Sequence, residues 1–204
     1  RANLLRAVSH DLRTPLTSIS GNADNLLAND EVFDIETRRQ IYTDIREDSE
    51  WLISLVENLL SVSRMGDGKS DIRMSAELVS DVIDEAVRRT EKNASEHKLT
   101  VKENDGILLA RMDARLIVQV LINLIDNAIK YTPSGSEIEI SAVEKDNKIA
   151  ITVADNGHGI ADEIKPRVFD MFYTGAEKIA DSRRSLGLGL ALCKSIVNAH
   201  GGEI

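Results

Sequence analysis

A histidine near the start of the sequence stands where a helix would hold it in solvent. The apolar residues around it recur every seven positions, which is typical of the buried stripe of an amphipathic helix: Leu5, Leu12, Ile19 and Leu26. His10 follows Leu5 by five positions, and a turn of about 100° per residue directs its side chain away from the stripe. An imidazole is largely neutral at cellular pH and can then act as a nucleophile. His10 is therefore a candidate for covalent chemistry.

A second candidate site lies on a predicted helix that covers about residues 113–131. Asn123 and Asn127 are four positions apart and Lys130 follows after three more, so the three side chains share one face. An amide oxygen is a suitable ligand for Mg²⁺, which retains several waters and also binds phosphate oxygens. A lysine beside the ion balances phosphate charge. This helix face therefore favours a magnesium-dependent phosphate site.

Two glycine-containing segments follow that helix in the sequence. Asp155 directly follows a predicted strand and precedes Gly157 and Gly159, which permit close approach of the backbone to a ligand. A carboxylate at a strand end can accept a hydrogen bond from an exocyclic amine such as that of adenine. Gly187 and Gly189 open the last predicted helix, whose N-terminal N–H groups favour anions. The first segment predicts a contact with a base and the second a contact with phosphates.

The order of these motifs resembles that of the sensor histidine kinases of two-component systems. The string Ser-His-Asp-Leu-Arg-Thr-Pro-Leu at residues 9–16 is similar to the H box of that family. Four further segments resemble its N, G1, F and G2 boxes in the family's order: residues 123–131, 155–160, 169–173 and 185–192. The strings typical of Walker P-loop proteins and of Ser/Thr protein kinases are absent from the sequence. The resemblance covers nearly the whole chain.

The resemblance implies a role for three residues of the first helix. His10 would receive the γ-phosphoryl group of ATP and pass it to an aspartate of a response regulator. Asp11 would orient the imidazole or accept its proton. Thr14 stands four positions after His10, and the His-Asp-x-x-Thr pattern resembles that of bifunctional kinases, which also dephosphorylate their regulator. The expected catalytic residues are therefore His10, Asp11 and Thr14.

The resemblance also implies ATP and Mg²⁺ as cofactors. Asn127 is the expected Mg²⁺ ligand, Asn123 would lie by the phosphates, and Asp155 would bind the adenine amino group. The other expected nucleotide contacts are Lys130, Tyr131, Gly157, Gly159, Phe172, Arg184, Gly187, Leu188 and Gly189. Ser185 replaces the glycine that is commonest in the family. Residues 182–189 and the surroundings of the H box look most like those of KdpD-type kinases, which respond to potassium supply.

The expected fold class is an α-helical hairpin followed by an α+β two-layer sandwich. Apolar stripes predict helices over about residues 1–27 and 35–65, with a bend at Pro15. Two helices cannot bury both stripes, so a homodimer through residues 1–66 is expected, with the two hairpins forming a four-helix bundle. The glycine-containing segment at residues 65–70 predicts the domain boundary. Residues 1–66 would form the dimerisation and phosphotransfer hairpin, and residues 67–204 the ATP-binding domain of the histidine kinase/gyrase B/Hsp90 type.

In the second domain the pattern predicts helices over residues 76–93, 113–131 and 188–200. Strands are expected near residues 99–103, 107–112, 137–143 and 148–154, antiparallel and with helices on one face. A polar lid is expected over residues 173–185, and Asp113 is the expected N-cap of its helix. Residues 200–204 are expected to begin a closing strand that is cut short, since the family's domain continues beyond it.

The amino-acid composition argues against several classes of protein. The net charge of −9 and the absence of a long basic run argue against nucleic-acid binding. The single cysteine, Cys193, excludes an internal disulfide. The sequence has no segment of membrane-span length and no visible signal peptide. We therefore expect a cytoplasmic fragment of a sensor that reaches the membrane only through segments upstream of it.

Two other classes stay open at this point. One is a non-signalling ATPase with the same nucleotide-binding fold, from which phosphorylation of His10 would distinguish a kinase. The other is a degenerate kinase that dimerises and binds partners without turnover, against which the intact set of Asn123, Asn127, Lys130 and Asp155 argues. The sequence also leaves open the stimulus, the identity of the regulator, and whether transfer to His10 occurs within or between subunits.

Overall fold

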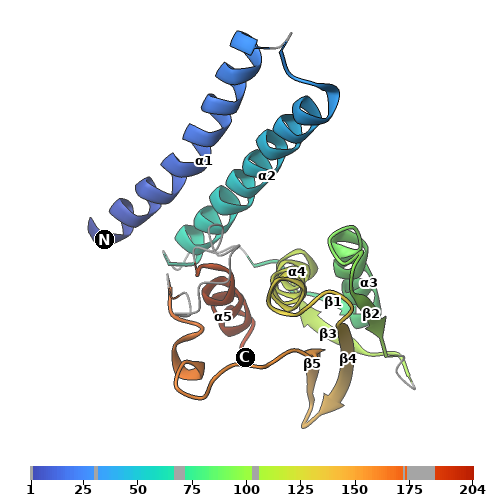
Figure 1. Ribbon diagram of the computed structural model, residues 1–204. Helices are drawn as coiled ribbons and strands as arrows, with labels where there is room; N and C mark the ends of the chain where they lie inside the picture. Colours follow the sequence, from blue (N-terminus) through green and yellow to red (C-terminus); the bar gives the residue numbers. More distant parts are fainter. Residues whose placement is uncertain (1, 30–31, 67–71, 103–105, 172, 174–186) are drawn as a thin grey trace. The chain divides into compact units, whose positions relative to one another are not determined.

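The structure is a computed structural model that describes residues 2–29, 32–66, 72–102, 106–171, 173 and 187–204. Side chains are described from Leu12 onward in the first helix and up to Val56, Ser54 excepted, in the second. The described residues form two compact units (Figure 1): a helical unit that extends to residue 61 and an α/β unit that begins at residue 62.

The helical unit is a hairpin of two long helices, α1 (Ala2–Asn29) and α2 (Ile35–Gly66), as the apolar stripes predict. α1 continues as a helix through Pro15. α2 begins where the carboxylate of Asp34 accepts the N–H of Thr37 at 2.7 Å, a cap that satisfies one donor of the first turn. This hydrogen bond lowers the pKa of Asp34. No helix in the described part of the chain is long and apolar enough to cross a lipid bilayer.

Much of the apolar surface of the hairpin is exposed in the single chain. Leu55 is buried, whereas Leu16 is 54% exposed and Ile53 is 59% exposed. The other large apolar side chains exposed on the hairpin are Leu27, Val32, Ile35, Tyr42 and Val56. Burying such residues is the main favourable term in protein association, so this surface is suited to a partner.

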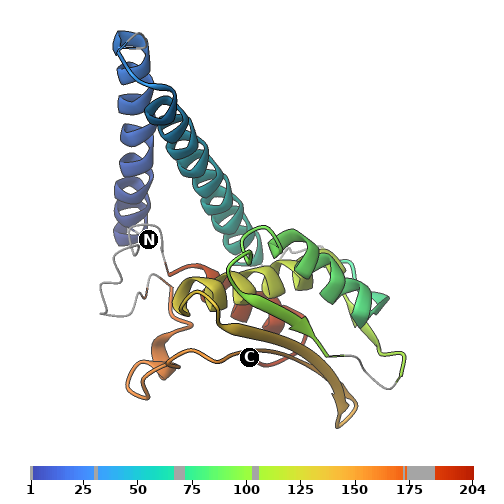
Figure 2. The ribbon, with the colours of Figure 1, turned by 45° about the vertical axis from the view of Figure 1, so that its right-hand side comes forward.

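The second unit consists of a small mixed sheet and three helices. β2 (Lys98–Val101), β4 (Glu137–Lys145) and β5 (Lys148–Asp155) form one sheet in the order β2–β4–β5, with β2 parallel to β4 and β4 antiparallel to β5. β1 (Ser75–Leu78) and β3 (Leu109–Met112) form a separate antiparallel pair. The helices are α3 (Val79–Thr90), α4 (Ala114–Tyr131) and α5 (Gly189–Ala199), and a 3₁₀ turn, η1, covers Lys165–Arg167. Figure 2 shows α3 and α4 along one face of the β4–β5 hairpin.

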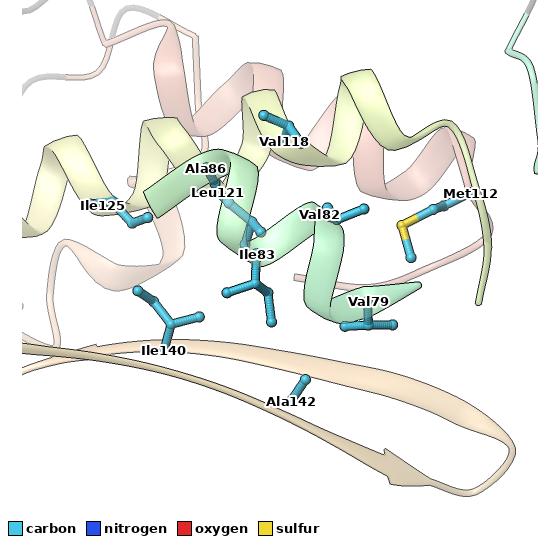
Figure 3. Close-up of a cluster of buried hydrophobic side chains, with 10 residues drawn as sticks. All are labelled: Val79, Val82, Ile83, Ala86, Met112, Val118, Leu121, Ile125, Ile140 and Ala142. Atoms are coloured by element: carbon cyan, nitrogen blue, oxygen red, sulfur yellow. The ribbon is translucent and has the colours of Figure 1, made fainter. Parts of the chain in front are cut away.

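The core lies between these helices and the sheet. Residues of β4 alternate between the core and solvent, so that Ile140 and Ala142 are buried while Glu139 and Ser141 are not. Figure 3 shows Ile140 facing Ile125 of α4, with side chains of α3 beside them. A second, smaller cluster joins α4 to α5 through Val120, Leu192, Cys193 and Ile196. The core thus fixes α4 against the sheet and α5 against α4.

Two sequence expectations about this unit are wrong. The helix expected over residues 76–93 begins only at Val79, because residues 75–78 pair as a strand with residues 109–112. The strands are not all antiparallel, because β2 pairs with β4 in parallel after a connection that includes β3 and α4. Residues 202–204 are described but form no regular element, so the expected closing strand is not seen within them.

Asp113 occupies the N-cap position of α4, as expected, but its side chain makes no capping hydrogen bond to the first turn. Instead, its carboxylate accepts the N–H of Arg73 at 3.2 Å and hydrogen bonds from Arg115 at 3.1 and 3.3 Å. Burial alone would raise the pKa of Asp113, and these hydrogen bonds lower it below its ordinary value. Asp113 therefore ties the segment before β1 to the start of α4.

Candidate functional site

α4 carries the asparagine face that the sequence predicts. Asn123, Asn127 and Lys130 are half-buried at spacings of four and three residues, while Leu121 and Ile125 on the opposite face are buried in the core. Within the described residues no cluster of three or more His, Cys, Asp or Glu side chains could hold a metal ion. An amide oxygen such as that of Asn127 suits Mg²⁺, which usually takes its remaining oxygens from phosphate and water.

The amide of Asn123 lies against the N-terminus of α5. A Cβ atom built on Gly189 would be 3.8 Å from the Cγ and Oδ1 atoms of Asn123. The Nδ2 atom of Asn123 is buried and has no hydrogen-bond acceptor among the described residues. Since buried donors are nearly always paired, an anionic oxygen at this position would satisfy this amide. It would also lie at a helix N-terminus, where the N–H groups of the first turn have no acceptor within the helix. The arrangement fits a phosphate group.

Cys193 lies behind this amide, one turn further along α5. Its side chain is fully buried, its Sγ atom is 3.7 Å from the carbonyl oxygen of Val120, and burial raises the pKa of the thiol to about 12. The nearby Asn123 amide lowers that pKa in part, but sulfur is only a weak acceptor and does not replace an oxygen partner for Nδ2. Cys193 is therefore a packing residue with a protonated thiol.

The loop after β5 is held against the C-terminal end of α4. The Oδ1 atom of Asp155 accepts the N–H of Gly157 at 2.9 Å. A Cβ atom on Gly157 would lie 2.7 Å from the Cγ2 atom of Thr132 and 2.9 Å from the Oδ1 atom of Asp155, so any side chain at this position would force its neighbours to shift. The Oδ1 atom of Asn156 accepts the N–H of Glu137 at 2.9 Å and closes the end of the β4–β5 ladder. Asp155, the last residue of β5, is thus an exposed carboxylate held at the start of this loop.

Gly187 gives the chain its turn into α5. Its φ of +63° is a left-handed conformation that residues with a side chain rarely adopt. Leu188, which follows, is buried, and its carbonyl oxygen accepts the N–H of Leu192 to start the helix. The expected phosphate-binding residues Gly187, Leu188 and Gly189 therefore surround one helix N-terminus.

Aromatic side chains lie at two further points of the unit. At the end of α4 the Nζ atom of Lys130 is 5.6 Å from the ring centroid of Tyr131. At the end of η1 the guanidinium of Arg167 lies 4.4 Å from the ring centroid of Tyr173, and Lys194 of α5 lies 5.8 Å from that of Phe169. The contact with Lys194 places Phe169, the first residue of the F-box segment, near α5.

Some expected site residues lie outside the description. Phe172 and Arg184, and the expected lid apart from Tyr173 (residues 174–185), are not among the described residues. His10 and Asp11 belong to α1, but their side chains are not described. Thr14 is described and exposed on α1. The structure therefore places the expected nucleotide residues of α4, β5 and α5 in one unit and the expected phosphoacceptor in the other.

The described part of α1 carries a shallow groove whose first described lining residue is Leu12, two positions after His10. The described residues that line it belong to α1, at positions that repeat every four: Leu12, Arg13, Leu16, Thr17, Ser20, Gly21 and Asp24. The groove combines apolar side chains with one charge of each sign, and Gly21 leaves open space where a side chain would stand. Such a mixed helix face is typical of a contact surface for another protein.

Two residues at the site have no role assigned to them from the sequence: Thr132, and Asp126 within the segment 123–131. Thr132 donates its hydroxyl to the carbonyl oxygen of Ala128 at 2.7 Å and presents its methyl group to Gly157. Asp126 lies three positions after Asn123, so it borders the asparagine face, and burial raises the pKa of its carboxyl group. The helical spacing would have identified Asp126, whereas the contact of Thr132 depends on the fold.

Comparison with known families gives two matches. Residues 1–68 match the His Kinase A (phospho-acceptor) domain, and residues 112–204 match the family described as histidine kinase-, DNA gyrase B- and HSP90-like ATPase. Together these matches include both the H-box helix and every expected nucleotide residue.

Individual relatives agree with these matches. Over its whole length the chain is 48% identical to the sensor protein KdpD of Clostridium acetobutylicum, and it covers 23% of that protein. It is similar in structure to the histidine kinase AdeS of Acinetobacter baumannii, with a TM-score of 0.71, 26% identity, and coverage of 93% of this chain and 86% of the other. The histidine kinase ThkA, solved in complex with the response regulator TrrA, has a TM-score of 0.67 at 22% identity, with coverage of 98% and 55%. The chain spans less than a quarter of the first two curated relatives it matches.

Proposed function

Since this chain belongs to the sensor histidine kinases of two-component systems, we propose that it transfers the γ-phosphoryl group of ATP to His10 and then to an aspartate of a response regulator. One observation supports the part of this proposal that concerns nucleotide binding. The buried Nδ2 atom of Asn123 lacks an acceptor and lies against the N-terminus of α5, next to a helix face that also holds Asn127 and Lys130.

We assign the parts of the nucleotide to three elements. Asp155, at the end of β5, accepts a hydrogen bond from the adenine amino group, and the close approach of Gly157 keeps that carboxylate in place. Lys130 and Tyr131 line the nucleotide at the end of α4. The N–H groups at Gly187, Leu188 and Gly189 bind phosphate oxygens at the N-terminus of α5. Gly159, Phe172 and Arg184 complete the proposed contacts.

Bound Mg²⁺, with Asn127 as its protein ligand, supplies charge neutralisation on the phosphates. Residues of this chain do the rest by positioning. Lys130 balances the remaining negative charge, and the amide of Asn123 donates to a phosphate oxygen. A lone pair on a ring nitrogen of His10 forms the new N–P bond while the bond from the γ-phosphorus to the bridging oxygen breaks and ADP leaves. Asp11 orients the ring and accepts the proton that the imidazole releases.

The domain organisation that this reaction requires is also proposed. Residues 1–66 form the dimerisation and phosphotransfer hairpin, and residues 67–204 form the ATP-binding domain. The segment around Gly68, which lies outside the described residues, would connect the domains so that the nucleotide can reach His10. The exposed apolar side chains of the hairpin, Ile53 and Val56 among them, support a homodimer in which two hairpins form a four-helix bundle.

The groove along α1 supports a binding site for the second partner, the response regulator. It starts two residues after His10 and extends to Asp24. We propose that the receiver domain of the regulator binds along this face, so that its aspartate reaches the phosphorylated histidine. Thr14 is exposed on the same helix, and its hydroxyl would orient the water that hydrolyses the aspartyl phosphate of the regulator.

The experiment that tests the kinase is incubation with γ-labelled ATP and Mg²⁺, comparing the chain with its His10→Gln variant. The expected label is acid-labile and alkali-stable, as a phosphoramidate is, and is absent from the variant. ATP that binds without labelling His10 would overturn the kinase reaction and favour a binding-only domain. ATP hydrolysis that is unaffected by His10→Gln would instead favour the non-signalling ATPase.

A further inference from the structure

α5 depends on α4 for its position. Among the described residues it packs mainly on α4, through the small apolar cluster that contains Val120, Leu192 and Ile196. The two helices run in opposite directions, since Gly189 lies near Asn123 while Cys193 lies near Val120. Figure 1 shows them side by side. Glycines with positive φ stand on both sides of α5, Gly187 at +63° and Gly201 at +73°. Apolar packing is not directional, so a further contact is needed to fix how far α5 sits along α4.

His200 provides a directional contact at the far end of α5. Its Nε2 atom accepts the backbone N–H of Asp113 at 3.0 Å, and its Nδ1 atom is 2.7 Å from the carbonyl oxygen of Ile196. Because Nε2 accepts a hydrogen bond, the ring proton belongs to Nδ1, which donates it to Ile196. Both ring nitrogens are therefore used, and the geometry defines one neutral tautomer.

The residue that His200 binds is itself firmly held. Asp113 is only 3% exposed, and its carboxylate is bound to the N–H of Arg73 and to the side chain of Arg115. Its carbonyl oxygen accepts the N–H groups of Leu116 and Ile117, which begin α4. A hydrogen bond to the Asp113 N–H thus ties the end of α5 to a fixed point between β3 and α4.

We propose that His200 is a positioning residue for the nucleotide site. The Nε2 bond fixes the register of α5 on α4, and α5 has 11 residues, so its N-terminus lies about 16 Å from its C-terminal end. A helix is stiff over this length, and a shift at His200 moves Gly187, Leu188 and Gly189 relative to Asn123. This inference rests on the proposed binding of phosphates at the N-terminus of α5.

Two isosteric substitutions distinguish the roles of the two ring nitrogens of His200. In His200→Gln the amide oxygen can reach the position of Nε2 and accept the Asp113 N–H. In His200→Asn the amide nitrogen can replace Nδ1 and donate to Ile196, but nothing replaces Nε2. In His200→Asn the KM for ATP is expected to rise about threefold to tenfold, because one hydrogen bond is lost. The kcat at saturating ATP should stay near the wild-type value. The KM of His200→Gln should stay within about twofold of wild type.

Amide exchange supplies the direct readout. The measurement is hydrogen–deuterium exchange of the whole chain without nucleotide, followed at the Asp113 amide and at the first turn of α5. Faster exchange at both places in His200→Asn, but not in His200→Gln, would support the proposal. Equal KM values in both variants and wild type would overturn it, and so would equal increases in both variants. A wild-type chain that binds ATP without labelling His10 would count against the proposed kinase. The same two variants would then be compared with wild type by their dissociation constants for ATP, which still test the role of His200.

Discussion

The methyl group of Thr132 lies 2.7 Å from the point where a side chain on Gly157 would begin. Real Cβ atoms are essentially never this close to a neighbour, so the loop that follows β5 and the end of α4 can meet only because residue 157 is glycine. The Asp155 carboxylate, which accepts the N–H of Gly157, depends on the same approach. The proposed adenine contact is therefore tied to a steric fit that can be tested.

Gly157→Ala should weaken ATP binding by about tenfold, on the order of 1.4 kcal/mol, because the added methyl group displaces the loop and with it Asp155. Titration calorimetry with ATP measures the effect. Gly106→Ala is the matched control, since a Cβ atom there would meet nothing within 4 Å. Adding Thr132→Ser, which removes the opposing methyl group but keeps the hydroxyl, should restore part of the affinity. A Gly157→Ala chain with wild-type affinity would contradict the assignment of this loop to the nucleotide.

Asp126→Asn should stabilise the fold at pH 7. Burial raises the pKa of Asp126 above its unfolded value, and its one described hydrogen bond comes from Asn93 at 3.5 Å. Because the pKa is higher in the folded state, the protonated carboxyl group stabilises the fold at pH values below its pKa in the unfolded state. This stabilisation is lost as the pH rises through the pKa in the folded state. The uncharged amide avoids this penalty, so a gain on the order of 1 kcal/mol is expected at pH 7.

Urea unfolding of Asp126→Asn and wild type at pH 7 and pH 4 checks this sign. The difference in the free energy of unfolding should shrink at pH 4, where the wild-type carboxyl group is increasingly protonated. Asp84→Asn, an exposed substitution on α3, controls for the general change in net charge. A destabilised Asp126→Asn chain at pH 7 would show that the carboxylate has a favourable partner in the fold.

Thr14→Ala should lower the dephosphorylation of the regulator at least about tenfold, because the hydroxyl that orients the attacking water is lost. The measurement is the decay of phosphorylated regulator mixed with the chain, compared with labelling of His10 by ATP. Ser18→Ala is the control on the same helix, since Ser18 is exposed and is not among the described residues that line the proposed regulator groove. If Thr14→Ala removes the regulator's phosphate at the wild-type rate, the role of Thr14 is wrong.

The double substitution Ile53→Glu and Val56→Glu should convert the homodimer to a monomer. These side chains are 59% and 46% exposed in the single chain, and charges there would have to be desolvated in a four-helix bundle. Sedimentation equilibrium over a range of concentrations reports the change in mass. Gln40→Lys adds a charge at another exposed position of α2 and should leave the dimer intact. A wild-type chain that is monomeric throughout would overturn the proposed dimer.

The sequence correctly predicts structural features that depend on residues close to one another along the chain. The face shared by Asn123, Asn127 and Lys130 follows from helical spacing alone, and the start of β4 follows from the alternation of residues 137–141. The strand at residues 75–78 was not predicted, because it runs directly into α3 and its partner lies more than thirty residues away. The parallel pairing of β2 with β4 has the same cause. No local pattern connects His200 to Asp113, 87 positions earlier, or Thr132 to Gly157.

The burial of Cys193 gives the molecule a chemical probe of its own. It is the only cysteine in the sequence, and in the folded state its thiol is enclosed between α4 and α5 with a pKa of about 12. Alkylating reagents attack the thiolate, so modification of the intact fold requires α5 to separate from α4 first. The rate at which such a reagent modifies the chain therefore measures how often that helix pair opens, and protection by nucleotide would report the coupling of that opening to the occupied site.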